Sequence, residues 1–305
     1  MVRNVASFFR ELEDEDFYLL SGIEHGMRFS QWVDDSKLPD LSGLSSKEIA
    51  YRVKRCKKYH LIEQKIIQYK GYRLRFEGYD ALALRSFVER GVIEKFGSII
   101  GVGKESEVYE VQSYKSLALK YHREGYTNFR KVNQNRDYTS KNRHFSWMYT
   151  ARKAAEKEFE VLETLYPKVS VPHPIDQNRH AILMEMVDGE NLSEVRLERD
   201  QIIATLSLIL GEVSNAIDKG YVHSDLSEYN IFVEEKGVTI FDWPQAVKTS
   251  HVNAEELLKR DIENISKYFK RKYPSEIQRM DTKKLVEDIL DGEFNQRLDV
   301  YFDDA

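Results

Sequence analysis

The sequence predicts an α+β fold with two domains that meet near residue 90. Three features support this prediction. The first ninety residues show helical spacing around one short pair of strands, residues 92–111 alternate apolar and polar side chains around a glycine-rich centre, and helical spacing returns after residue 151. A chain of 305 residues, 41% of them hydrophobic, is long enough to build two hydrophobic cores.

The first domain, residues 1–90, is predicted to be mostly helical. Ser45 and Glu48 have the spacing of a capping box ahead of an apolar helix. Residues 66–74 read as two short strands that turn at Lys70-Gly71, and residues 80–88 resume helical spacing. Helices followed by a small hairpin resemble a winged helix.

The second domain begins with strands and ends with helices. Residues 92–111 and 116–121 read as strands, residues 151–165 as a helix and residues 181–187 as a buried strand. Three further helices are predicted over residues 200–219, 253–269 and 282–290, the first of them closed by Gly220.

The charge is concentrated at the end of the chain. The formal net charge is −5, and residues 281–305 alone hold eight acids and three bases, so residues 1–280 are neutral overall. We therefore expect an acidic helical tail over residues 276–305. A neutral body argues against general coating of nucleic acid, but it allows a local basic patch.

Cysteine and apolar runs indicate the compartment. Cys56 is the only cysteine, which excludes an internal disulfide and a multi-cysteine zinc site. The N-terminus lacks the apolar stretch of a signal peptide, and the longest apolar run, residues 202–210, is too short to cross a membrane. We expect a soluble cytoplasmic protein without a membrane partner.

A glycine-rich segment lies between the first two predicted strands of the second domain. It reads Gly101-Val102-Gly103-Lys104-Glu105-Ser106. Glycines in such a turn let backbone N–H groups approach phosphates, although ordinary hairpin turns use them too. The segment is not a Walker A motif, because Glu105 stands where Ser or Thr is required.

Two charged residues follow in order. Lys120 ends the apolar strand 117–120, where it either extends to the surface or binds a phosphate. Glu158 lies on the next predicted helix and would form an ion pair with Lys120. Glu156 and Glu160 flank it, so a solvated helix face is the alternative interpretation.

A carboxylate and an amide lie five residues apart in His223-Ser224-Asp225-Leu226-Ser227-Glu228-Tyr229-Asn230. Asp225 would orient or deprotonate a nucleophile, and the Asn230 side-chain oxygen would ligate Mg²⁺. Asp242 follows the next apolar strand and a tight turn, so the spacing places it beside Asn230, where the two would share the metal. We expect His223 to be structural.

The order of these elements resembles the protein-kinase set of a glycine-rich loop, a strand lysine, a helix glutamate, an H-x-D-x-x-x-x-N loop and a metal-binding aspartate. Met184-Glu185-Met186-Val187 looks like a kinase hinge. The resemblance implies that Met184 is the gatekeeper and that Glu185 and Val187 face the adenine edge. Three further residues would enclose the adenine ring: Val108, Ala118 and Phe232.

The departures from that set identify the chain as similar to the RIO family of atypical kinases. Ser106 replaces the third glycine, Asp242-Trp243-Pro244 stands where Asp-Phe-Gly is usual, and only 63 residues follow Asp242. This leaves no room for an ordinary activation segment and peptide-binding platform. The first domain, with Gly71-Tyr72-Arg73-Leu74, resembles the winged-helix-bearing second subfamily. The short stretch after the kinase domain is similar to that of an archaeal-type member.

The resemblance implies a reduced bilobal kinase domain over residues 91–275, with an N-lobe over 91–184, a hinge over 185–190 and a C-lobe over 191–275. It implies ATP with Mg²⁺ or Mn²⁺ as cofactors. Lys120 would contact the phosphates with Glu158 orienting it, and residues 103–106 would hold the triphosphate. Asp225 would act as acid and base, and Asp242 would be the phospho-acceptor.

The family acts in maturation of the small ribosomal subunit, which implies RNA-facing surfaces here. One candidate is a basic run in the first domain: Lys47, Arg52, Lys54, Arg55, Lys57 and Lys58. Another is the basic segment 122–147, whose aromatic residues would stack on bases or cover ATP: Tyr126, Phe129, Tyr138, Phe145 and Trp147. Their alternative interpretations are a solvated helix face and a disordered excursion.

Three functions remain open at this point. The first is an ATPase or serine kinase of ribosome assembly. The second is a small-molecule phosphotransferase, since antibiotic- and choline-type kinases share the H-x-D-x-x-x-x-N layout. The third is a nucleic-acid-binding regulator with an inert kinase domain. The N-terminal domain and the short tail weigh against the second, and the complete set of competent residues weighs against the third.

Overall fold

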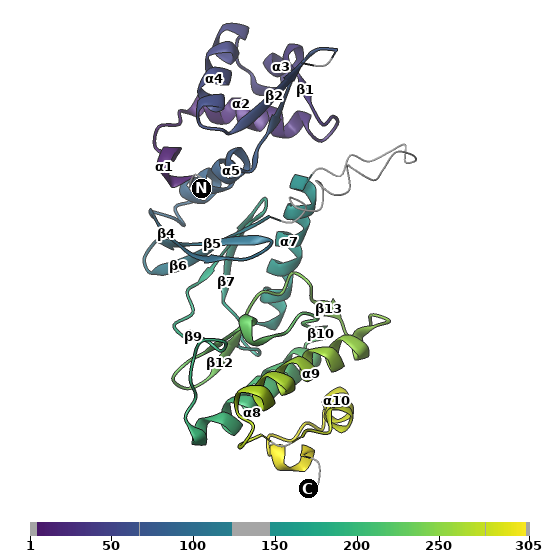
Figure 1. Cartoon of the computed structure of the whole chain (residues 1–305). Helices are drawn as coiled ribbons and strands as arrows, with labels where there is room; N and C mark the ends of the chain where they lie inside the picture. The colour runs from purple at the N-terminus through teal and green to yellow at the C-terminus, as the bar shows by residue number, and fades with distance from the viewer. Residues whose placement is uncertain (1–4, 67, 124–146, 278, 303–305) are drawn as a thin grey trace. The chain divides into compact units, whose positions relative to one another are not determined.

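A computed structural model describes residues 5–66, 68–123, 147–277 and 279–302 of the chain (Figure 1). The chain divides into two compact units. Unit 1 contains Met1–Glu156 and Asp176–Leu183, and unit 2 contains Lys157–Ile175 and Met184–Ala305. Residue 90 lies inside unit 1, so the predicted domain boundary there falls within this unit and stays a prediction.

The N-terminal part of unit 1 is a helical layer with a three-stranded antiparallel sheet in the order β1-β3-β2. Its helix α2 contacts α3, α4, α5 and β3, so it is the central element. In chain order the elements are α1 (Ala6–Phe9), α2 (Asp14–Gly26), β1 (Val33–Asp34), the 3-10 helix η1 (Asp35–Lys37), α3 (Leu38–Ser42), α4 (Ser46–Lys58), β2 (Ile62–Ile66), β3 (Lys70–Leu74) and α5 (Phe76–Glu89).

The start of α4 has the Ser45 half of the predicted capping box, while the Glu48 carboxylate accepts from Arg52 Nε at 2.6 Å. Ser45 Oγ accepts a hydrogen bond from the Glu48 N–H at 3.3 Å. The hairpin turn was predicted in the wrong place. Lys70 and Gly71, predicted as the turn, are the first residues of β3. A Cβ on Gly71 would lie 2.9 Å from the Trp32 Cβ, so glycine is needed for close packing of Trp32 rather than for a turn.

The rest of unit 1 is built on a five-stranded sheet in the order β4-β5-β6-β8-β7. Strands β4, β5 and β6 form an antiparallel meander in which β5 is central. Helix α7 follows β6 in the chain after residues 124–146. The elements are β4 (Lys95–Val102), β5 (Ser106–Gln112), β6 (Ser116–His122), α7 (Trp147–Leu165), β7 (Pro174–Asn178) and β8 (Ala181–Glu185). The division between the units falls within α7, β7 and β8.

Unit 2 is mainly helical, with two small sheets of short strands, β12-β11-β9 and β10-β13. Its elements are β9 (Glu190–Asn191), α8 (Arg199–Asp218), β10 (Tyr221–Val222), the 3-10 helix η2 (Glu228–Asn230), β11 (Ile231–Val233), β12 (Val238–Ile240), β13 (Val247–Lys248), α9 (Ala254–Lys272), α10 (Thr282–Leu290) and the 3-10 helix η3 (Leu298–Tyr301). Gly220, with φ of +87°, follows the end of α8 as predicted.

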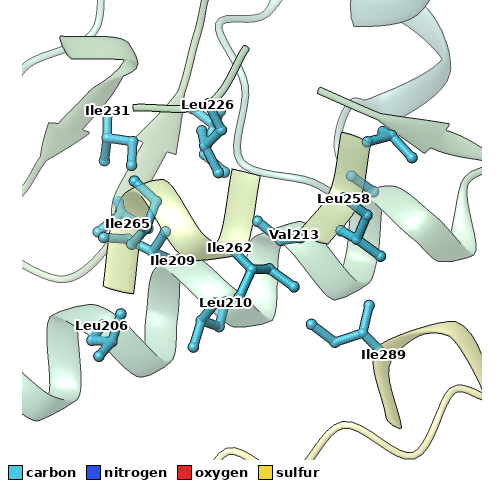
Figure 2. Close-up of a cluster of buried hydrophobic side chains, with 14 of the residues drawn as sticks. Leu206, Ile209, Leu210, Val213, Leu226, Ile231, Leu258, Ile262, Ile265 and Ile289 are labelled. Atoms are coloured by element: carbon cyan, nitrogen blue, oxygen red, sulfur yellow. The ribbon is translucent and has the colours of Figure 1, made fainter. Parts of the chain in front are cut away.

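In the core of unit 2, helices α8, α9 and α10 pack together with the loop before β11. Apolar side chains of α8 and α9 interdigitate, and Leu226 and Ile231 pack on them, as Figure 2 shows. Leu226 is 1% exposed and lies directly after Asp225. Its packing in this core therefore holds in place the loop that carries the predicted catalytic carboxylate.

The acidic tail belongs to the same core. Its apolar residues are buried in the cluster formed by α8 and α9: Leu285, Val286, Ile289, Leu298 and Tyr301. The Asp281 carboxylate caps α10 by accepting hydrogen bonds from the Lys283 and Lys284 N–H groups. Among the residues that the structure describes, none forms a helix with the length and hydropathy of a membrane span.

Candidate active site

The predicted catalytic loop runs from β10 to β11. Asp225 is exposed between two buried neighbours, Ser224 and Leu226. The Asn230 side-chain amide donates from Nδ2 to the Asp225 carbonyl at 2.8 Å. This bond fixes the orientation of the amide, so Oδ1 of Asn230 is its remaining ligand atom. Asp225 and Asn230 are therefore held as one group within the loop.

Three residues of α9 hold this loop in place, a role that the sequence analysis did not assign to them. The Asp261 carboxylate accepts hydrogen bonds from the Ser224 and Leu226 N–H groups at 2.7 and 3.0 Å, which are the amides on both sides of Asp225. Arg260 donates to the Ser224 carbonyl, and Asn264 donates to the Leu226 carbonyl at 3.2 Å.

Asp261 is 1% exposed, and burial raises the pKa of its carboxyl group, while His223 and the two backbone N–H groups act in the opposite direction. One signal in the sequence would have found it. Asp261 lies between Leu258 and Ile262 on the apolar face of its helix, where a carboxylate needs buried partners.

The β11–β12 hairpin brings Asn230 and Asp242 to the same end, as predicted. Ile231 pairs with Ile240, and the Phe241 N–H donates to the Asn230 carbonyl at 3.0 Å. Nε2 of His223 lies 3.1 Å from the Phe241 carbonyl, which gives His223 the structural role that we expected. Asp242 follows with φ of +68°, a strained conformation for a residue with a side chain.

Glu158 lies next to this aspartate segment. It is 1% exposed, so the solvated-face interpretation is wrong, and its Oε1 accepts a hydrogen bond from the Trp243 N–H at 3.0 Å. The Trp243 ring is fully buried and its Nε1–H donates to the Ile240 carbonyl at 3.0 Å. The departure from Asp-Phe-Gly at this position therefore supplies an indole that the core of unit 2 encloses.

The glycine-rich segment and Lys120 are in unit 1. The Gly103 N–H donates to the Ser106 carbonyl at 2.8 Å, which closes the turn between β4 and β5. Val108 on β5 is the register partner of Lys120 on β6, and Ala118 lies two residues along β6 on the same face. Lys120 is 5% exposed, which excludes the alternative that it simply extends into solvent. Gly101, Lys104 and Glu105 complete the segment.

The predicted hinge is in unit 2. Met184 is 8% exposed, and the Glu185 N–H donates to the His173 carbonyl at 2.9 Å. Nδ1 of His173 also lies 3.1 Å from Oε1 of Glu185. Val187 is half-buried, as is Phe232, whose ring stacks on Phe241 at a centroid distance of 4.4 Å.

The two sets of predicted site residues thus belong to different units. Lys120, Val108, Ala118 and residues 101–106 are in unit 1, whereas Glu158, the hinge, Asp225, Asn230, Phe232 and Asp242 are in unit 2. The Lys120–Glu158 ion pair, and the assignment of each residue to ATP or metal, stay predictions.

The donor set at the hairpin suits a magnesium ion. Asn230 and Asp242 offer an amide and a carboxylate oxygen, and Mg²⁺ is usually held by one or two protein ligands with water and substrate phosphates. Among the described residues no group of three or more His, Cys, Asp or Glu side chains is placed to hold a metal by itself. A magnesium ion here would therefore depend on phosphate oxygens for further ligands.

The predicted nucleic-acid surfaces are smaller in the structure than in the sequence. Arg52 is 6% exposed and bonds to Glu13 and Glu48, so its assignment to a surface was wrong. Arg55 has a side chain that is 20% exposed, and it bonds to Asp16, so its charge is already paired within the domain. The exposed bases of the run are Lys47, Lys54, Lys57 and Lys58.

The segment 124–146, with Tyr126, Phe129, Tyr138 and Phe145, lies outside the described residues. Trp147 is described, and its ring packs on Phe76 at a centroid distance of 3.8 Å and on Tyr79 at 5.9 Å. These contacts position Trp147 within unit 1, and its stacking on bases or ATP stays a prediction.

Comparison with known families decides the identity of the chain. The sequence pattern of the RIO domain matches residues 107–285, and that of the Rio2 N-terminal domain matches residues 9–90. The chain belongs to the RIO kinase family. It carries the features of the Rio2 branch, which confirms the resemblance and the predicted order of a winged-helix domain followed by a kinase-like domain.

Other RIO kinases match nearly the whole chain. The RIO-type serine/threonine-protein kinase Rio2 of Methanocaldococcus jannaschii is 40% identical over 86% of this chain and 98% of its own length. The serine/threonine-protein kinase RIO2 of Saccharomyces cerevisiae is 33% identical over 87% of this chain, but the match spans only 65% of the yeast protein.

A solved RIO structure is also similar. The Rio2 kinase of Chaetomium thermophilum in an ADP/Mg²⁺-phosphoaspartate complex has a TM-score of 0.77 and 30% identity, and the match covers 94% of this chain and 93% of the solved one. These relatives confirm the prediction that the chain is an atypical serine/threonine kinase of the RIO type.

Proposed function

We propose that this RIO kinase transfers the γ-phosphoryl group of ATP in the presence of Mg²⁺ or Mn²⁺. The observation that carries the proposal is the hairpin set. Asn230 donates to the carbonyl of Asp225 and accepts from the N–H of Phe241, the residue directly before Asp242. The solved Chaetomium relative, described as a complex with ADP, Mg²⁺ and phosphoaspartate, supports the same chemistry.

Each part of the set has a distinct task in the proposal. Asn230 and Asp242 would hold the metal, which neutralises charge on the phosphates. Lys120 and backbone groups of residues 101–106 would bind phosphate oxygens, with Glu158 orienting Lys120. The adenine would contact the hinge at Glu185 and Val187, next to Met184, and three apolar residues: Val108, Ala118 and Phe232.

Two acceptors are chemically reasonable. In the first, a carboxylate oxygen of Asp242 attacks the γ-phosphorus, the bond from that phosphorus to the β-phosphate oxygen breaks, and ADP leaves. Water then attacks the aspartyl phosphate and restores the carboxylate. In the second, a serine hydroxyl attacks, and Asp225 takes its proton. The fixed backbone around Asp225 and the strained φ of Asp242 support precise placement of both carboxylates.

The two acceptors can be separated by the stability of the product. The protein is incubated with γ-labelled ATP and Mg²⁺, and the labelled protein is then treated with hydroxylamine, which cleaves acyl phosphates. Label that hydroxylamine removes and that is absent from Asp242→Asn supports the aspartyl route. Hydroxylamine-stable phosphoserine that is lost in Asp225→Asn supports the serine route. Glu235→Gln, an exposed carboxylate change at the opposite end of the same hairpin, is the matched control.

We also propose that the precursor of the small ribosomal subunit is the partner and that the protein acts in the cytoplasm. Exposed lysines on α4 support contact with phosphate groups. Trp32, the residue before β1, is half-buried, and the Arg73 guanidinium lies 4.5 Å from the centroid of its ring. Purified small subunits added to the labelling reaction should change the rate of ATP hydrolysis, whereas large subunits should not.

The alternatives make different predictions in the same assay. A small-molecule phosphotransferase would label an added alcohol and leave the protein unlabelled. An inert regulator would bind RNA and show no turnover of ATP. Matches of both domain types over residues 9–90 and 107–285 favour the RIO kinase function over either alternative.

A further inference from the structure

A buried ion cluster lies in unit 1, beside the glycine-rich segment. It joins Asp80 of α5, Glu107 of β5, Arg123 after β6 and His180 in the turn between β7 and β8. Arg123 donates to both carboxylate oxygens of Asp80 at 2.7 and 2.8 Å and to Glu107 at 2.8 Å. Nε2 of His180 lies 2.8 Å from the Asp80 carboxylate.

The cluster is nearly closed to solvent. The side chains of Arg123, Glu107 and Asp80 are 12%, 12% and 8% exposed, and that of His180 is 0% exposed. Burial lowers the pKa of His180 to about 4, so this ring is neutral near pH 7 and donates from Nε2 to Asp80. Tyr79 stacks on the ring at 4.4 Å. Removing one partner of such a cluster leaves a buried charge uncompensated.

Arg123 also binds the glycine-rich segment through its backbone. Its N–H donates to the Glu105 carbonyl at 2.7 Å. Glu107, whose carboxylate accepts a hydrogen bond from the Arg123 guanidinium, lies two residues after Glu105, near the start of β5. One residue therefore fixes residues 105–107 by main chain and side chain, and connects them to α5 through Asp80.

We propose that Arg123 is a positioning residue for nucleotide binding, because it holds the phosphate-binding segment 101–106 in register with helix α5. The inference rests on the proposed binding of ATP by this segment. A bidentate guanidinium suits this task, since a lysine ammonium is a point charge that cannot bond to both oxygens of Asp80 and to Glu107 in the same planar arrangement.

A second ion pair of unit 1 provides a matched control. Arg179, in the same turn as His180, donates to the two oxygens of Glu24 at 3.0 and 2.8 Å. This pair connects the turn to α2. Among the described residues, the Arg179 side chain donates to Glu24, Leu82 and Asn178 rather than to residues 101–107. Arg179→Lys should therefore reduce the stability of unit 1 without moving the glycine-rich segment.

The test compares Arg123→Lys, Asp80→Asn and Arg179→Lys for affinity and stability. The dissociation constant of each protein for ADP is measured by calorimetry in the presence of Mg²⁺. The kcat and KM for ATP are measured by phosphate release, and Tm is measured by circular dichroism. We expect Arg123→Lys and Asp80→Asn to weaken ADP binding and raise KM at least tenfold, with kcat at saturating ATP within threefold of wild type. Arg179→Lys should lower Tm and leave both affinities within twofold.

The pairing predicts non-additive effects as well. Because Asp80 acts through Arg123, the double variant should bind ADP no more than about twofold more weakly than the worse single variant. If Arg123→Lys does not fold, Asp80→Asn alone carries the comparison with Arg179→Lys.

The outcomes separate this inference from the proposed function. Wild-type affinity for ADP in folded Arg123→Lys and Asp80→Asn proteins would overturn the inference alone. Equal losses of affinity in Arg179→Lys and Arg123→Lys would do so too, since the effect would then follow stability. Failure of the wild-type protein to bind ADP with Mg²⁺ would overturn the proposed function and, with it, the inference.

Discussion

The carboxylate of Glu158 accepts the backbone N–H of Trp243, the residue that directly follows Asp242. A helix glutamate predicted to serve Lys120 is thus in contact with the segment that carries the predicted metal ligand. Its side chain is buried, so the hydrogen bond is shielded from water. Glu158 therefore has a structural task in unit 2, whatever it does for Lys120.

Glu158→Ala should destabilise the protein more than Glu158→Gln. Alanine leaves the buried Trp243 N–H without its acceptor, which costs about 1–3 kcal/mol in the free energy of unfolding, whereas the glutamine oxygen can still accept. Urea denaturation of both variants measures the difference. Equal destabilisation by the two substitutions would contradict a role for this bond.

Asp261→Asn should lower kcat for phosphoryl transfer and destabilise unit 2. An amide offers one acceptor oxygen, so one of the Ser224 and Leu226 N–H groups would face an NH₂ group. We expect a loss of about 1–3 kcal/mol in stability and at least a tenfold fall in kcat, because Asp225 lies between the two amides. Asp291→Asn, an exposed change in unit 2 outside the predicted site, is the control. An unchanged kcat would show that the backbone around Asp225 does not need this anchor.

The stability of the protein should fall between pH 6.5 and pH 4 because of His180. Its folded pKa of about 4 lies below the ordinary value of 6.5, so the unfolded chain binds a proton in this range and the folded chain does not. The contribution of His180 to the free energy of unfolding is fully present above pH 6.5 and is lost as the pH falls towards 4. From pH 7 to pH 5 we expect a loss of about 2 kcal/mol from this residue.

The matched variant for that measurement is His180→Gln, which lacks the titrating ring. Chemical denaturation at pH 7 and pH 5 should show a smaller pH dependence for the variant than for wild type. The same slope in both proteins would rule out His180 as its source.

Gly78→Ala should disrupt the N-terminal part of unit 1. A Cβ on Gly78 would lie 2.3 Å from the backbone oxygen of Leu61, and a backbone atom cannot move aside as a flexible side chain can. We expect a loss of about 1–3 kcal/mol or more. Gly237→Ala, where no atom lies within 4 Å of the added Cβ, should stay within about 0.5 kcal/mol of wild type. Thermal unfolding of both variants is the measurement, and equal Tm values would contradict the close packing of α5 on Leu61.

The double variant Lys54→Glu/Lys58→Glu should bind RNA of the small ribosomal subunit more weakly and keep its Tm, because both lysines are exposed. We expect at least a tenfold loss of affinity at low salt and a shallower dependence on salt concentration. Arg52→Ala, in contrast, should lower Tm, since Arg52 bonds to Glu13 and Glu48 inside the domain. A double variant with wild-type affinity would remove α4 from the RNA-binding surface.

The elements predicted most accurately from the sequence were helices of several turns and strands of several residues, because these are long enough to show a clear period. Helix α10 begins and ends at the predicted residues, α8 differs from the prediction by one residue at each end, and β6 differs by one residue at its end. Strands such as β9, β10 and β13 have two residues each, too few to show a period. The wing was displaced because Gly71 was interpreted as a turn residue, although its small size is needed for Trp32.

Some features of the candidate site could likewise be predicted from local sequence, whereas others depend on packing between distant segments. Asn230 and Asp242 could be placed together because one short hairpin separates them in the sequence. The helical pattern places Asp261 on a buried face, but its partner is the loop at Ser224, 37 residues away, which the local pattern does not identify. Arg52 was misplaced because a run of bases does not show which of them have acidic partners on another helix.

The buried position of Tyr301 has a consequence for how the protein folds during synthesis. The Tyr301 side chain is 0% exposed in the core that α8 and α9 form. The Asp281 N–H donates to the backbone carbonyl of Tyr301 at 2.7 Å. Unit 1 draws its residues from positions up to 183, so its chain is complete early in translation. Unit 2 cannot close its core until Tyr301 has been synthesised. The core on which Leu226 packs, next to Asp225, is therefore completed only after the whole glycine-rich segment has been synthesised.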